Sequence, residues 1–315
     1  MPSEPTRWVW RARAGWPTWR RGPRSRRRWT RASSRPTRPG RVPGVDPLDR
    51  PLRILWQGRA VSILCYHSVA PGWDDPVSVE PIDFDAQCAA LARRGGVVSL
   101  DSVQAHVASH GDAPAGATVL TFDDGFADYV DHAVPIMSRY GLTASMYIVA
   151  GSLRPEGVTI DWITGLDPAD APPLMTADHI RELHDRGWHI GSHSMVHADL
   201  PTLSEAECLA DLTESRELLS DLLGTAVNTL AYPFGHHAEH VRRAAQKAGY
   251  DIALALPDRP EQGERYAVPR TGVYRGNPMW KFRVKNMGLY ARVRTSSAYQ
   301  HATGAASALR SRIGA

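Results

Sequence analysis

The sequence has few cysteines and no long apolar run. Its three cysteines, Cys65, Cys88 and Cys208, are far apart, so they form neither a CxxC pair nor a disulfide framework. Cys65 and Cys88 stand among apolar residues and are expected to be small buried hydrophobes. No stretch of about 18 apolar residues is available for a transmembrane helix, and the N-terminus lacks the apolar core of a secretory signal. These absences predict a cytoplasmic protein, with peripheral contact with a membrane as the alternative.

Acidic residues are scarce near both ends of the chain, and the charge is therefore uneven. Residues 1–60 hold 16 Arg, no Lys and 3 acids, a net charge of 16 − 3 = +13. Because the whole chain sums to +4, the rest of the chain sums to 4 − 13 = −9. The folded part is thus acidic, and the basic isoelectric point does not indicate a nucleic-acid partner.

Composition divides the chain into three parts. Residues 1–55 are rich in Arg, Pro and Trp without apolar periodicity, which predicts a disordered extension. That extension suits nucleic acid or an anionic membrane, or it reflects a start codon placed too early. Residues 56–275 predict one barrel domain. Residues 276–315 carry seven basic and no acidic side chains, which predicts a partly helical tail, either on an anionic membrane or glycan or packed on the barrel.

Strands and helices alternate from residue 61 onward. Helical spacing with glycines at the helix ends separates the strands, and Ser204 with Glu207 forms a capping-box pattern. The spacing of apolar residues from 130 to 140 predicts one helix that contains Pro135 and ends at Gly141. The alternation predicts a parallel α/β barrel, whose site is expected where the strands end. Short apolar runs predict strands over residues 61–66, 97–100, 118–122, 144–149, 188–191, 229–232, 251–256 and 268–273.

Two adjacent carboxylates end the strand over residues 118–122. Neighbouring residues of a strand point to opposite faces, so Asp123 and Asp124 can serve one site only where the strand gives way to a loop. Gly125 supplies that break, because glycine tolerates conformations that other residues avoid. Two like charges this close repel, which favours a cation beside one carboxylate and a different role for the other. A solvated turn is the alternative.

Two histidines four residues apart follow a later strand. His193 and His197, together with Asp124, would form a His-His-carboxylate set that leaves metal positions open for water. These ligands suit Zn²⁺, and Co²⁺, Ni²⁺ or Fe²⁺ would fit them too. Two polar residues on a helix face or in a loop are the alternative for the pair alone.

These motifs resemble those of a known family. Thr-Phe-Asp-Asp-Gly at 121–125 and His-Ser-Met-Val-His at 193–197 resemble the first two motifs of the polysaccharide deacetylases, the NodB-homology fold of carbohydrate esterase family 4. The resemblance covers residues 61–275. It implies a distorted (β/α)7 barrel in which Asp124, His193 and His197 bind one divalent metal ion. It also implies that Asp123 is the general base that deprotonates a metal-bound water.

A third motif is similar but altered. Ala-Tyr-Pro-Phe-Gly at 231–235 resembles the motif whose aromatic residue, here Phe234, helps to hold the oxyanion through its backbone N–H. Tyr232 in the same motif is a further candidate substrate contact. The family's motif opens with an arginine that orients the base, and this chain has Ala231 there. Arg270, at a late strand, is the candidate replacement.

The general acid is expected from an unusual place. The family usually carries a Leu-x-His motif near the end of the domain, but none follows Pro233 in this chain. Ile-Leu-Cys-Tyr-His at 63–67 resembles that motif moved to the front, as in the circularly permuted poly-N-acetylglucosamine deacetylase branch. The resemblance implies that His67 protonates the leaving amine. A strand-terminal histidine with a structural hydrogen bond is the alternative.

Further candidates lie in loops. A loop as long as residues 151–175 is usually functional or disordered. Trp162 within it is a candidate for stacking on a sugar ring, with packing inside the loop as the alternative. His236 and His237 follow the third motif and are expected to be surface residues or substrate contacts.

Together these observations predict a metal-dependent N-deacetylase. Its substrate would be an N-acetylated sugar in a polysaccharide or glycoconjugate. Two other classes stay open: an O-acetyl esterase or cyclic-amide hydrolase on the same barrel, and a non-catalytic glycan-binding relative. The sequence leaves the glycan, the native metal and the oligomeric state open.

Overall fold

The computed structural model describes residues 61–110, 113–257 and 265–299, within one compact unit, Asp46–Ala315. The predicted extension over residues 1–55 and the end of the basic tail lie outside this range. The strands are β1 (Ser62–Tyr66), β2 (Ser68–Val69), β3 (Ser78–Val79), β4 (Thr118–Phe122), β5 (Ser145–Ile148), β6 (His189–Ser192), β7 (Thr229–Ala231), β8 (Ile252–Ala255), β9 (Val268–Pro269) and β10 (Thr271–Gly272). The α-helices are α2 (Pro81–Arg94), α3 (Leu100–His110), α4 (Val134–Arg139), α5 (Ala177–Asp185), α6 (Glu205–Leu223), α7 (Glu239–Lys247), α8 (Met279–Lys285) and α9 (Leu289–Thr295).

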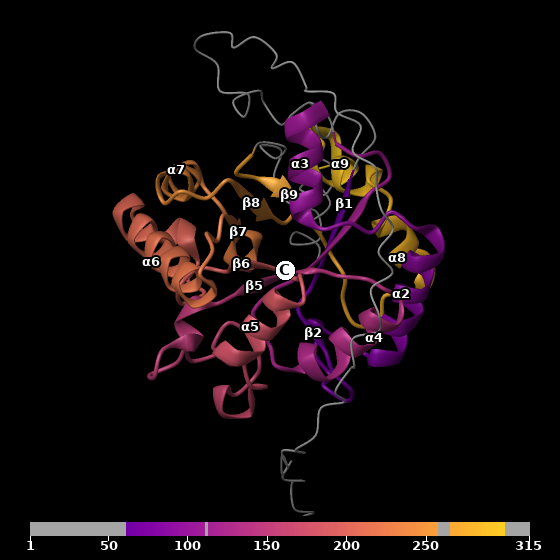
Figure 1. The fold of residues 1–315 in the computed structure, drawn as a ribbon, viewed down its shortest axis with the longest axis horizontal. Helices are drawn as coiled ribbons and strands as arrows, with labels where there is room; N and C mark the ends of the chain where they lie inside the picture. The colour runs from indigo at the N-terminus through magenta and orange to yellow at the C-terminus, as the bar shows by residue number, and fades with distance from the viewer. Residues whose placement is uncertain (1–60, 111–112, 258–264, 300–315) are drawn as a thin grey trace, which may run out of the picture. The chain divides into compact units, whose positions relative to one another are not determined.

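Eight strands form one parallel sheet in the order β10-β1-β4-β5-β6-β7-β8-β9, and helices surround it (Figure 1). The two edge strands are consecutive in the chain, because only Arg270 separates β9 from β10. β9 pairs with β8 and β10 pairs with β1, so the segment 268–272 joins both edges of the sheet. If β9 and β10 are counted as one strand, the barrel has seven strands, and the predicted (β/α)7 barrel is confirmed.

The strands are buried on both faces, as expected for a parallel barrel. Alternate residues such as Ile63, Val119 and Leu254 form a cluster of strand residues from around the barrel, with Tyr147 of β5 and Val268 of β9. The residues between them form other clusters with the surrounding helices. This alternation decides which side chains can reach the barrel's interior and which cannot.

Local sequence signals account for several helix ends. The predicted capping box of α6 is present, with Ser204 Oγ accepting the Glu207 N–H and the Glu207 side chain accepting the Ser204 N–H. A second box, not predicted, links Thr176 and His179 at the start of α5. Gly224 ends α6 in the left-handed conformation, as glycine commonly does at helix ends.

Two predicted elements are different in the structure. Residues 97–100 form no strand, because only Val97 makes an isolated bridge to Thr118 and α3 already begins at Leu100. The single helix expected around Pro135 is divided into a π-helical turn, η1 (Tyr129–Ala133), followed by α4. Pro135 thus lies at the start of α4, where a missing N–H breaks no helical hydrogen bond.

α8 and α9 follow the barrel and lie within residues 276–299, the part of the predicted tail that the structure describes. None of the helices in the described ranges is both long and apolar enough to cross a bilayer.

Candidate active site

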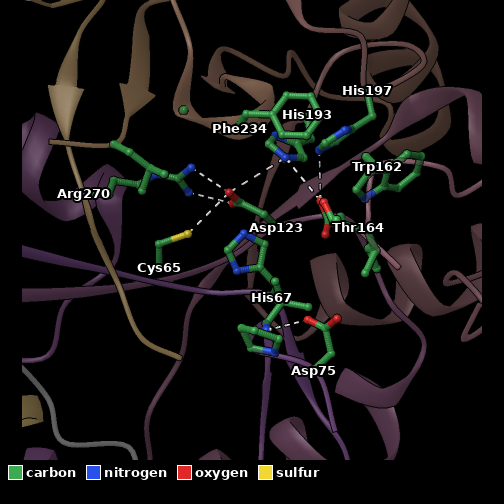
Figure 2. Close-up of a pocket in the computed structure, with 16 residues that line it drawn as sticks. Cys65, His67, Asp75, Asp123, Trp162, Thr164, His193, His197, Phe234 and Arg270 are labelled. Atoms are coloured by element: carbon green, nitrogen blue, oxygen red, sulfur yellow. Dashed lines mark hydrogen bonds and ion pairs between the residues drawn. The ribbon is translucent and has the colours of Figure 1, made fainter. Parts of the chain in front are cut away.

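A pocket lies at the carboxyl ends of the strands, where the sequence motifs meet (Figure 2). Cys65 lies on β1 and His67 directly after it, and Asp123 and Asp124 directly follow β4. The remaining walls come from the segments that follow β6, β7 and β8, from the β9–β10 segment and from two loops. Their lining residues are His193, His197, Phe234, Gly235, Leu256, Arg270, Asp75, Pro76, Val77, Trp162, Ile163 and Thr164. Eight of the nine site residues that the sequence indicates are therefore in one place.

Asp123 is held by a two-pronged pair with Arg270. Arg270 Nη1 donates to Asp123 Oδ1 and Nη2 to Oδ2, both at 2.6 Å, and the arginine is only 1% exposed. Arg270 Nη1 also donates to Thr121 Oγ1 at 3.1 Å. Thr121 and Asp123 are two residues apart on β4, so they share a face and meet the same guanidinium. Bidentate pairing of this kind fixes the carboxylate's plane as well as its charge.

This pairing determines the charge of Asp123. Burial alone would raise the pKa of the carboxyl, but the neighbouring Arg270 guanidinium, with His193, holds that pKa below its usual value. The Arg270 guanidinium is itself buried, and the Asp123 carboxylate keeps its pKa above the ordinary value. Asp123 is therefore a fixed carboxylate that is available to accept a proton.

Strained backbone conformations are concentrated at the site. In the described ranges, four residues other than glycine have left-handed φ: Asp124 at 70°, Ser194 at 66°, His197 at 57° and Phe234 at 58°. All four belong to the three sequence motifs. Such conformations are uncommon and cluster at functional sites. At Asp124, the left-handed turn breaks the strand's alternation, so both carboxylates face the pocket, as the sequence predicts. Gly125 follows with φ of 82°.

Asp124, His193 and His197 form a compact ligand set. Asp124 Oδ1 lies 3.4 Å from His193 Nε2 and 3.3 Å from His197 Nε2. Two donors that each bind a tetrahedral ion at about 2.0–2.1 Å are separated by about 3.3–3.4 Å, so the spacing fits one small divalent ion. All three residues are buried, and their donor atoms lie within 4.8 Å of one another. Two imidazoles and a carboxylate suit Zn²⁺ and similar ions.

The residues that contact His193 and His197 also favour a metal-binding role for these two histidines. His193 Nδ1 lies 2.8 Å from the Ala231 carbonyl oxygen, which can only accept a hydrogen bond. Nδ1 therefore carries the proton in neutral His193, and the lone pair of Nε2 faces Asp124 Oδ1. This second interaction is typical of metal-binding histidines. Trp162 stacks on His197 with ring centroids 4.3 Å apart. The indole therefore orients the His197 ring, and the His197 ring covers one face of the indole.

His67 lies across the pocket from this set (Figure 2). It follows β1 immediately, and its ring lies parallel to that of Tyr274 with centroids 6.4 Å apart. Its Nδ1 is buried and has no hydrogen-bond partner among the described residues. The structural hydrogen bond considered as an alternative for His67 is therefore absent at this atom.

Phe234 and Tyr232 are placed differently from each other. Phe234 lines the pocket with 39% of its surface exposed. Tyr232, expected beside it as a substrate contact, is fully buried outside the pocket, and its hydroxyl donates to the Tyr266 carbonyl oxygen at 3.0 Å. The physical reason is strand alternation, because Ala231 faces the barrel's interior and Tyr232 faces the helices. His236 bonds to Asp199, and His237 is buried beside Arg242.

Cys65 is the contact that the sequence-based interpretation missed. Its Sγ lies 3.4 Å from Asp123 Oδ2, where the thiol donates a third hydrogen bond to the carboxylate. A signal existed, because Cys65 is two residues before His67 and shares its face of β1. Cys65 is fully buried, as predicted, but it also forms part of the pocket wall.

Comparison with known proteins finds a family model that matches part of the chain. The family model described as "Polysaccharide deacetylase" matches residues 110–253. The chain is 24% identical over 193 residues to the Bacillus subtilis protein YxkH, covering 61% of this chain and 63% of that protein. It is also 24% identical over 172 residues to the poly-beta-1,6-N-acetyl-D-glucosamine N-deacetylase of Staphylococcus aureus, covering 51% and 55% of the two chains. The chain thus spans less than two thirds of these relatives.

Solved structures agree with the fold. The deacetylase PplD from Streptococcus pyogenes superposes with a TM-score of 0.59 at 19% identity, covering 72% of this chain and 98% of that one. IcaB from Ammonifex degensii superposes with a TM-score of 0.58 at 19% identity, covering 75% and 98%. At such identities the likeness concerns the fold.

Proposed function

We propose that this chain is a member of the polysaccharide deacetylase family and a metal-dependent hydrolase that removes N-acetyl groups from a glycan. The observation that carries the proposal is the bidentate Asp123–Arg270 pair beside the three-residue ligand set. It places a proton acceptor and a candidate cation site at the same edge of the barrel. Hydrolysis of an acetamide needs both, because water is a weak nucleophile and nitrogen a poor leaving group.

The cofactor in this proposal is one divalent metal ion, with Zn²⁺ preferred. Asp124, His193 and His197 would hold it. Its chemistry, when it is bound, is that of a Lewis acid, which polarises a carbonyl group and lowers the pKa of water. Trp162 keeps the His197 ring in place, and the Ala231 carbonyl does the same for His193.

Asp123 acts as the general base in this proposal. Arg270 and Cys65 together donate two hydrogen bonds to Oδ2, while Arg270 donates one to Oδ1. Oδ1 therefore retains a lone pair that can accept a proton from the attacking water. Arg270 takes over the orienting role for which the third motif of this chain has no arginine.

Two groups act on the substrate's acetamide. The backbone N–H of Phe234, in its left-handed turn, donates to the oxygen that becomes negative when water adds. His67 then gives a proton to the amide nitrogen as the C–N bond breaks, which releases acetate and an amine. The substrate class proposed is a polymer of N-acetylglucosamine, because a relative of 24% identity is named for that activity.

The test is acetate release from a panel of N-acetylated and O-acetylated glycans, including poly-β-1,6-N-acetylglucosamine. We expect release from an N-acetylated polymer, and a loss of about 10³-fold in kcat for Asp123→Asn with metal content unchanged. Asp75→Asn is the matched control, because Asp75 lines the same pocket but its Oδ1 accepts the Val77 N–H, and we expect its kcat to be preserved. Release from O-acetylated glycans alone would replace the proposal by an esterase, and release from none, with metal bound, by a glycan-binding protein.

A further inference from the structure

The last two helices expose apolar side chains among basic ones. In the described ranges eight large hydrophobic side chains are exposed, and five of them lie within residues 280–293. Lys281 and Arg283 are exposed in the same segment. We call this set the α8–α9 surface: Trp280, Lys281, Arg283, Val284, Met287, Leu289 and Val293. An apolar group of this size on a soluble protein usually marks an interaction site.

The side of α8 opposite the exposed residues is packed against the rest of the protein. The apolar side chains are therefore not exposed because the helix is loosely attached. Phe282 is 1% exposed and packs in the main hydrophobic cluster. Asn286, which follows α8, accepts a hydrogen bond from Thr118 Oγ1 at 3.0 Å on its side chain. Its carbonyl accepts another from Arg94 Nη1 at 2.9 Å. Trp280 and its neighbours are therefore exposed on a helix that is held in a defined orientation.

The charge of this surface distinguishes between possible partners. A second copy bound through the same surface would bring Lys281 and Arg283 close to the same cations of its partner, which is unfavourable. An anionic membrane matches both features, because apolar side chains enter the headgroup boundary while cations face phosphate groups. Tryptophan is enriched at such boundaries. We propose that the α8–α9 surface binds anionic phospholipid membranes.

The anchoring contacts also fix the orientation on the membrane. Thr118 is the first residue of β4, and Ser62, the first residue of β1, donates to the Lys285 carbonyl at 3.4 Å. α8 is thus attached where these strands begin, whereas the pocket lies where they end. A protein bound through the α8–α9 surface therefore keeps its pocket open to the aqueous phase. This inference stands whether or not the pocket is a deacetylase site.

A site-specific probe tests the contact directly in the full chain. Met287→Cys carries a polarity-sensitive fluorophore, and the native Cys65, Cys88 and Cys208 are buried and do not compete for the label. Ile82→Cys is the matched control, because Ile82 on α2 is 79% exposed but outside this surface. With phosphatidylglycerol-containing vesicles we expect the emission at position 287 to shift to the blue and that at position 82 to stay unchanged. Vesicle binding through the arginines of residues 1–60 alone would not shift the emission of the label at position 287, so the probe separates the two modes of binding.

Substitutions give a second readout in vesicle co-sedimentation. Trp280→Ser with Leu289→Ser should weaken vesicle binding by about tenfold, since two large apolar side chains leave the interface. Ile82→Ser should leave binding unchanged, and Lys281→Glu with Arg283→Glu should weaken binding to anionic vesicles but not to neutral ones. An unshifted label at 287 while the protein co-sediments would overturn the proposal. So would a shift that depends on protein concentration without vesicles, which indicates a second copy.

Discussion

The pocket and the α8–α9 surface depart from the usual distribution of residues in opposite ways. In the pocket, ionised groups are buried: Asp123 and Arg270 are almost inaccessible to solvent, yet each has the other as a partner within 2.6 Å. On α8 and α9, large apolar side chains are exposed, and none of the described helices or strands covers them. A buried charge is stable when the chain supplies its partner. An exposed apolar group is instead accounted for by a partner outside the chain.

The barrel that holds the pocket and the C-terminal segment that holds the α8–α9 surface also differ in net charge. Residues 276–315 carry +7 and residues 1–60 carry +13, so residues 61–275, which form the barrel, carry 4 − 13 − 7 = −16. An anionic membrane would repel the barrel and attract the α8–α9 surface, which reinforces the orientation inferred from the anchoring contacts. The difference implies that substitutions in one region should leave the function of the other intact.

The largest effect expected in this comparison comes from removing the guanidinium group of Arg270 from the pocket. Arg270→Ala leaves the Asp123 carboxylate buried without its counter-charge, which should lower kcat by about 10²–10³-fold. The free energy of unfolding should fall by about 3–5 kcal/mol. Metal content and vesicle binding should be unchanged, as measured by elemental analysis and co-sedimentation. Arg270→Lys is the control, since it keeps the charge but loses the two-pronged geometry, and its kcat should be intermediate. Wild-type turnover in Arg270→Ala would refute the orienting role.

A smaller effect is expected from the buried side of α8. Phe282→Ala removes a ring that packs in the main cluster, and the free energy of unfolding should fall by about 3 kcal/mol. Hydrolysis by the folded protein should persist, because Phe282 is not among the residues that line the pocket. The label at position 287 should lose part of its shift on vesicles, because α8 is less firmly held. Chemical denaturation and acetate release measure the two properties separately. A variant that keeps its stability but loses turnover would contradict the separation of the two regions.

Local sequence patterns predicted the barrel and the order of its elements, because strand alternation and helix ends depend on nearby residues. Placing Asp123 and Asp124 at a strand end was enough to expect both in one site. The family model over residues 110–253 and the named relatives agree with the family that these motifs indicated. The catalytic roles of Asp123, His67 and Arg270 stay predictions, and the Asp123 and Arg270 variants test two of them.

Other features depend on contacts between distant parts of the chain. Closure of the barrel needs β10 beside β1, although about two hundred residues separate them, and local patterns carry no information on such pairing. Trp162 comes from a loop without periodicity, so its stacking on His197 was not predictable. The apolar residues of α8 have a composition typical of a packed helix, and only the structure distinguishes buried Phe282 from exposed Trp280. Tyr232 was misplaced because its motif, rather than strand alternation, guided the prediction.

The smallest expected effect concerns a carboxylate that has no cation beside it. Asp211 on α6 accepts the Met195 N–H at 2.9 Å in the loop between the two histidines. Burial raises the pKa of Asp211 to about 6, although the backbone N–H groups oppose the rise. Between about pH 4 and pH 6 the folded state therefore keeps a proton that the unfolded state has lost, so stability falls as pH rises.

Asp211→Asn keeps an oxygen for the Met195 N–H but cannot ionise. Relative to the wild type, its free energy of unfolding should rise by about 2 kcal/mol between pH 4 and pH 7. Denaturant titrations at several pH values measure this difference, in which the other titrating groups cancel. A difference for Asp211→Asn that stays constant with pH would show that burial without a cation is tolerated at this position. Asp123 and Asp211 would then differ only in the geometry of their hydrogen bonds and not in the free-energy cost of burying the carboxylate.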